Sequence, residues 1–131
     1  MNDLRIARTP HSPEVDFCFS EHRLTLSGEA YPEDAAAFFH PVLSALEQYL
    51  SGTDDSDIEF NFRLTYFNSA ATKMLYRLFG LLNESACTHN RIILRWQYDA
   101  EDDTLLEFGE GVRDDFNALE FHPVALGLAA I

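Results

Sequence analysis

The chain has 131 residues, of which 47% are apolar and 13% aromatic, and its formal net charge is −13. These values exclude a disordered protein and predict one globular domain, residues 1–131, with a single core. The negative charge repels nucleic acids and anionic membranes, so a protein with a basic patch is the better partner.

Cysteine and histidine usage predicts neither a metal site nor a cofactor. The two cysteines, Cys18 and Cys87, are too few for a disulfide framework, and no Cys/His pair has the spacing of metal ligands. No charged-then-apolar leader opens the chain, and no apolar run approaches the length of a membrane span. These features predict a cytoplasmic protein.

The N-terminal third predicts a strand and a hairpin. Residues 4–7 fit a first strand that ends at the turn-prone residues 9–13. Apolar residues alternate at Val15, Phe17 and Phe19 and again at Leu24 and Leu26, which predicts a hairpin.

A helix is expected to follow, opened by Tyr31 to Asp34 and stopped by Ser51-Gly52. Pro32 suits the first turn of a helix, and Glu33 and Asp34 would face the positive end of its dipole. Pro41 lies inside the apolar stripe and is expected to kink this helix, because proline has no N–H group to donate.

The remainder of the chain alternates strand and helix patterns. Apolar residues repeat with period two and then with helical spacing, and the switch falls at Asn68-Ser69. The expected elements are a strand over Ile58–Phe67, a helix from Ser69 to about Ala86, a strand over Arg91–Tyr98, a helix capped by Asp102 or Asp103, and an edge strand over Ala118–Val124, where Pro123 is tolerable.

The expected strands are apolar on one face and polar on the other. Polar residues such as Asp16, Thr25, Asn61, Arg63 and Arg95 alternate with the apolar ones. A sheet covered on both faces would instead consist of nearly continuous Val, Ile and Leu. The pattern therefore predicts a two-layer α/β domain with a mixed sheet, about three helices packed on one face, and a polar face open to water or a partner.

The strand-to-helix junction carries the candidate functional residue, Ser69. The first N–H groups of a helix lack internal partners and favour an anion, so a phosphate on Ser69 could be accommodated there. Such a phosphate adds nearly two negative charges at one point. The alternative is ordinary helix capping, the commonest role of Asn and Ser at such positions.

Neighbouring residues are expected to form a partner-binding surface around this switch. Lys73 lies one turn after Ser69 and could pair with a phosphate or steer a kinase, and Thr72 is a rival acceptor hydroxyl. Asn68 and Tyr66 complete the set, although Tyr66 and Trp96 also fit packing within the sheet.

No catalytic residue is expected. The chain has no glycine-rich phosphate loop and no G-x-S-x-G motif, and neither cysteine has a nearby histidine in a catalytic arrangement. The acidic residues between Asp99 and Asp115 lack the order of an EF-hand loop, so they fit a solvated helix face and cap.

The junction resembles that of the SiaC family of bacterial regulatory phosphoproteins. Residues Glu59 to Ser69 fit that family's strand pattern, (D/E)-Φ-x-Φ-R-Φ-x-Y-Φ-N-(S/T), and the blocks Gly28–Glu33 and Leu94–Asp99 also match. The resemblance spans about residues 3 to 116, and the tail from Asn117 to Ile131 has no counterpart in it.

The resemblance implies a STAS-like fold and a function. The hydroxyl after the Asn, here Ser69, is phosphorylated, and the unphosphorylated protein binds and activates a partner, typically a diguanylate cyclase that makes cyclic di-GMP in biofilm and aggregation control. A dedicated Ser/Thr kinase and a PP2C-type phosphatase set the phosphorylation state. Two alternatives stay open: an anti-sigma factor antagonist that switches partners by phosphorylation, and a small-ligand sensory domain.

Overall fold

The structure of the chain, a computed structural model, describes residues 1–127. The last four residues of the apolar tail Val124 to Ile131 lie outside this part. Strands and helices alternate along most of it: β1 (Leu4–Ile6), β2 (Glu14–Cys18), β3 (Arg23–Ala30), α1 (Ala35–Ser51), β4 (Asp57–Phe67), α2 (Ser69–Thr88), β5 (Arg91–Asp99), α3 (Asp103–Asp115) and β6 (Glu120–Leu126). A short 3-10 turn, Phe19–Glu21, joins β2 to β3.

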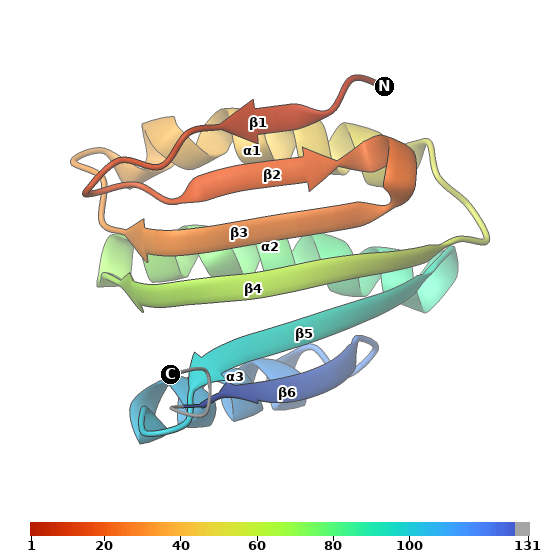
Figure 1. The fold of residues 1–131 in the computed structure, drawn as a ribbon. Helices are drawn as coiled ribbons and strands as arrows, with labels where there is room; N and C mark the ends of the chain where they lie inside the picture. The colour runs from red at the N-terminus through yellow and green to blue at the C-terminus, as the bar shows by residue number, and fades with distance from the viewer. Residues whose placement is uncertain (128–131) are drawn as a thin grey trace.

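One six-stranded sheet contains all of these strands in chain order, β1 to β6. The pairs β1–β2 and β2–β3 are antiparallel, and β3 to β6 run parallel. Successive parallel neighbours need crossover connections, which are right-handed in nearly all proteins, so α1, α2 and α3 cover the same face. Figure 1 shows the three helices together behind the sheet. The predicted two-layer α/β architecture is confirmed.

The core lies between the sheet and this helix layer. The alternating residues Phe60, Phe62 and Leu64 of β4 are fully buried, as is Trp96 of β5. The rings of Phe62 and Trp96 stack with centroids 3.9 Å apart, and Trp96 Nε1 donates to the carbonyl oxygen of Leu105 at 3.0 Å. Trp96 therefore packs in the core, as predicted. Its hydrogen bond to Leu105 links α3 to the sheet.

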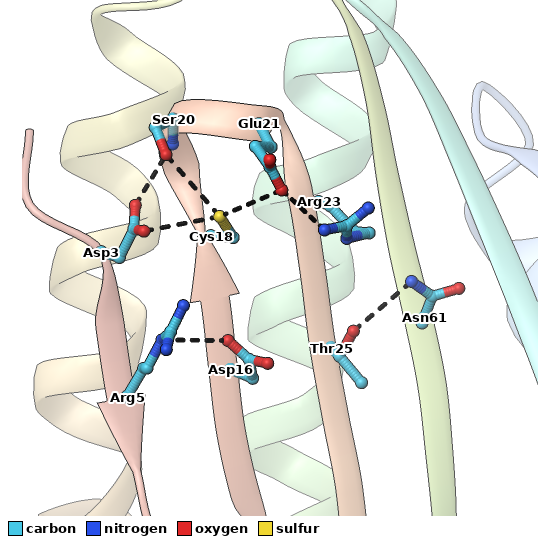
Figure 2. Close-up of polar contacts among 9 residues, drawn as sticks. All are labelled: Asp3, Arg5, Asp16, Cys18, Ser20, Glu21, Arg23, Thr25 and Asn61. Carbon is cyan, nitrogen blue, oxygen red and sulfur yellow. Dashed lines mark hydrogen bonds and ion pairs between the residues drawn. The ribbon is translucent and has the colours of Figure 1, made fainter.

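The opposite face of the sheet is polar and uncovered by helices, also as predicted. Figure 2 shows the part of this face around the beginning of β3, where Arg5 approaches Asp16 at 3.5 Å and Arg23 approaches Glu21 at 2.6 Å. Ion pairs between exposed side chains of this kind contribute little stability. We refer to this surface as the open face.

The beginning of α1 differs from the prediction. The helix starts at Ala35, and Pro32 and Glu33 precede it instead of forming its first turn. The reason is that Asp34 is the N-cap: its Oδ1 accepts a hydrogen bond from the N–H of Ala37 at 3.0 Å. The helix then continues through Pro41, whose side chain is exposed. The predicted kink at Pro41 stays a prediction.

The later elements match the prediction to within about two residues. Helix α2 ends at Thr88 instead of about Ala86, and Asp102 caps α3 by accepting from the N–H of Leu105 at 2.9 Å. The last strand is an edge strand, as predicted, but it begins at Glu120 instead of Ala118.

Two glycines of α3 provide a paired test of the helix–sheet packing. A Cβ atom on Gly109 would lie 2.5 Å from Trp96 Nε1, whereas a Cβ atom on Gly111 would meet nothing within 4 Å. We expect Gly109→Ala to lower the free energy of unfolding by about 1–3 kcal/mol, as overpacked cores do. Gly111→Ala should raise it by roughly 0.5–1 kcal/mol through helix propensity. Urea titrations of both variants measure these changes, and equal shifts in the same direction would refute this packing.

Candidate functional site

The junction between β4 and α2 is built around Asn68. Its backbone is extended, with φ −87° and ψ 178°, and its N–H donates to the carbonyl oxygen of Ala30 at the end of β3, at 3.2 Å. Its Oδ1 accepts a hydrogen bond from the N–H of Ala71 at 2.9 Å. Asn68 is therefore the N-cap, and it holds the start of α2 against the neighbouring strand.

Ser69 is the first residue of α2, and its side chain is exposed. Because Asn68 already caps the helix, the Ser69 hydroxyl is not needed for that role. Within residues 1–127 it forms no hydrogen bond, and the N–H groups of Ser69 and Ala70 find no acceptor. The capping alternative thus accounts for Asn68 and leaves the serine hydroxyl unused and open to solvent.

The rival hydroxyl of Thr72 is already in use. Thr72 Oγ1 donates to the carbonyl oxygen of Asn68 at 2.9 Å, and the N–H of Thr72 donates to the same atom, also at 2.9 Å. The side chain is partly buried inside the first turn. A kinase would have to break this hydrogen bond at Thr72, whereas no such bond protects Ser69.

Lys73 lies one turn beyond Ser69 and is exposed. Among the described residues no carboxylate pairs with its ammonium group. It lines a shallow groove between the beginnings of α1 and α2, together with Glu33, Asp34 and Ala70. Lys73 is therefore placed to meet a phosphate on Ser69 or an acidic group of a partner.

The local charge along α2 suits an anion at its beginning. From Ser69 to Asn83 the helix carries Lys73 and Arg77 and no acidic residue. The helix dipole and Lys73 favour negative charge at Ser69, whereas Glu33 and Asp34 in the groove that Lys73 lines oppose it. Further along, Tyr76 hydrogen-bonds to Asp115 of α3 at 3.1 Å, and burial together with this carboxylate raises the pKa of Tyr76.

Tyr66 differs from the expectation that it packs within the sheet, because 52% of it is exposed. The pairing of β4 with β3 explains this exposure: Leu64 pairs with Gly28 but Tyr66 pairs with Glu29, so Thr65 is an extra residue. Such a bulge breaks the alternation of side chains. Tyr66 consequently turns outward beside the junction.

Two further aromatic residues accompany Tyr66, and sequence reasoning did not assign either to the site. The Tyr31 ring meets the Tyr66 ring edge-on with centroids 5.6 Å apart, and the His11 ring meets Tyr31 in the same way at 5.4 Å. Tyr31 directly follows β3, which pairs with β4, so its position in the sequence could have indicated that it lies near Tyr66. His11 lies in the loop between β1 and β2, and its position in the sequence did not indicate that it approaches Tyr31.

Residues 1–127 contain neither a cluster of metal ligands nor a membrane-spanning helix. No group of three or more His, Cys, Asp or Glu side chains in this part of the chain could hold a metal ion. None of its helices combines the length and the apolar character needed to cross a membrane.

Comparison with known proteins gives the family. A model of the family described as SiaC family regulatory phosphoprotein matches residues 6–126. An uncharacterized protein of Pseudomonas aeruginosa strain UCBPP-PA14 is 30% identical over 115 residues, which cover 88% of this chain and 90% of that protein.

Solved structures of SiaC share the fold. The crystal structure of apo-SiaC from Pseudomonas aeruginosa has a TM-score of 0.87 and 29% identity, and the match covers 95% of this chain and all of that one. A chain in the crystal structure of the diguanylate cyclase SiaD in complex with its activator SiaC, from the same organism, has a TM-score of 0.88 and 28% identity, with 95% and 100% covered. The likeness to STAS domains stays a prediction. The chain belongs to the SiaC family of regulatory phosphoproteins.

Proposed function

We propose that this protein is a phosphorylation switch whose unphosphorylated form binds and activates a diguanylate cyclase. The observation that carries the proposal is the unused hydroxyl of Ser69, exposed at a helix start that Asn68 already caps. Membership of a family of regulatory phosphoproteins, and the complex of SiaC with SiaD, support the choice of partner.

The switch works through charge at the docking surface. In the unphosphorylated form, the exposed Tyr66 and the beginning of α2 present a surface that carries Lys73 together with the acidic Glu33 and Asp34. A phosphate on Ser69 places nearly two negative charges and their hydration shell within it. Burying that group against a partner costs desolvation energy and repels any acidic residue there, so the partner dissociates.

The proposal also fixes the roles of the other components. The protein has no enzymatic activity of its own and works in the cytoplasm as one domain. A Ser/Thr kinase adds the phosphate and a PP2C-type phosphatase removes it. The positive helix start and Lys73 tolerate the phosphate, so the modified protein stays folded and available for the phosphatase.

Two substitutions at Ser69 test the switch. We expect Ser69→Ala to bind and activate the cyclase as the unmodified chain does, and Ser69→Asp to bind at least about tenfold more weakly, because it places a charge in the contact. Each diguanylate cyclase of the source organism, purified separately, is titrated with the variants while cyclic di-GMP formation is measured. Ser44→Asp, which adds the same charge on the exposed side of α1, is the matched control and should bind normally. Equal binding by both Ser69 variants would contradict the proposal.

A separate prediction concerns which residue caps α2. Asn68→Ala should lower the free energy of unfolding by about 1 kcal/mol, because the N–H of Ala71 loses its acceptor. Ser69→Ala should change it by less than about 0.5 kcal/mol, since no hydrogen bond is lost. Thermal and urea denaturation of the free chain measure both values. A comparable loss in the two variants would mean that the serine hydroxyl is structural.

A further inference from the structure

The open face holds two arginines that pair with no carboxylate of residues 1–127, although the chain is strongly acidic. The chain has nine basic residues and 22 acidic ones. Five of the basic residues form ion pairs with carboxylates of the described chain: Arg5, Arg23, Arg91, Arg95 and Arg113. Of the others, Arg8 and Arg63 line the same groove. Two unpaired guanidinium groups in one groove are unexpected where acidic partners are so abundant.

The groove lies at the end of the open face near Ser69. Arg8 comes from the connection between β1 and β2, and Arg63 comes from β4. Ser27 and Gly28 of β3 and Thr65 of β4 contribute to the lining. Segments far apart in the sequence therefore bring two cations together with the hydroxyl groups of Thr9, Ser27 and Thr65.

Arg8 lies beside β3 and forms one hydrogen bond with it. Its Nη2 donates to Ser27 Oγ at 3.3 Å. Gly28 has φ +104°, a backbone conformation that favours glycine, and a Cβ atom there would lie 2.9 Å from Nε of the exposed Arg8 side chain. The carbonyl oxygen of Gly28 accepts a hydrogen bond from Thr65 Oγ1 at 3.3 Å. The glycine thus leaves space for Arg8 beside the strand that carries Arg63.

The surroundings favour a carboxylate carried on a protein over a free anion. Guanidinium groups bind carboxylates through paired hydrogen bonds of good geometry. Glu14 and Glu29 also line the groove without pairing with either arginine, and the net charge of −13 repels anions that approach from a distance. A single carboxylate held in place by a docked protein overcomes this repulsion, because the rest of the interface provides binding energy.

The groove is continuous with the surface proposed to dock the cyclase. Thr65 lines it, and the next residue is the exposed Tyr66, followed closely by the switch at Ser69. A partner that covers Tyr66 and Ser69 would have to extend over only a few residues of β4 to reach Arg63. We infer that Arg8 and Arg63 bind an aspartate or glutamate side chain of the cyclase that docks at Ser69, an inference that rests on the proposed function.

Substitution of the two arginines tests this inference on the full chain. Arg8→Gln and Arg63→Gln should each weaken cyclase binding by at least about tenfold, and the dependence of Kd on salt should become less steep. Arg63→Lys should restore part of the affinity. Arg23→Gln is the matched control: Arg23 is also exposed on the open face, at its opposite end, but pairs with Glu21 (Figure 2), so its loss should leave Kd within about twofold. Melting temperatures of the free variants show whether each one is folded.

The outcomes separate this inference from the proposed function. Normal binding by Arg8→Gln and Arg63→Gln, together with weak binding by Ser69→Asp, would overturn the carboxylate site and leave the switch intact. An equal loss of affinity in Arg23→Gln would also overturn it, because the effect would then reflect general charge. If the unsubstituted chain binds no diguanylate cyclase, the proposed function fails and this inference fails with it.

Discussion

The hydrogen bond from the N–H of Ala71 to Asn68 Oδ1 determines how this molecule presents Ser69, the proposed switch. It fixes the residue at which α2 begins after β4. The hydrogen bond from the Asn68 N–H to the carbonyl oxygen of Ala30 holds this residue against β3. Because Asn68 provides the side-chain cap, the Ser69 hydroxyl makes no hydrogen bond within the described residues. The phosphorylation proposed for Ser69 therefore breaks none of the hydrogen bonds that cap α2.

The sheet topology places this switch beside a free surface. Strands β3 to β6 are parallel and follow one another in order, so their crossover helices all lie on one side (Figure 1). The other side keeps its polar side chains and remains available for contact. The parallel strands β3 and β4 end beside each other, which brings Tyr31, Tyr66 and Ser69 to one edge, next to the groove of Arg8 and Arg63. A partner can touch the switch and the open face together.

Local patterns predicted most of the fold, and the exceptions have identifiable causes. The alternation from Ile58 to Leu64 and the helical spacing after Ser69 reflect burial on one face, which a sequence records directly. The exposure of Tyr66 could not be predicted, because the bulge at Thr65 arises from the pairing with β3. The meeting of Arg8 with Arg63 depends likewise on contacts between distant segments. Similarity to a known family, and not physical reasoning alone, led to the prediction that Ser69 is a phosphorylation site.

The central claim is that phosphate on one serine decides whether this acidic domain holds its partner. It is tested most directly by mass spectrometry of the protein isolated from its own cells, with the cyclase-bound and free fractions mapped separately. The account predicts unmodified Ser69 in the bound fraction and phosphorylated Ser69 confined to the free fraction. Phosphorylated Ser69 within the cyclase complex, or no phosphate on Ser69 in either fraction, would contradict it.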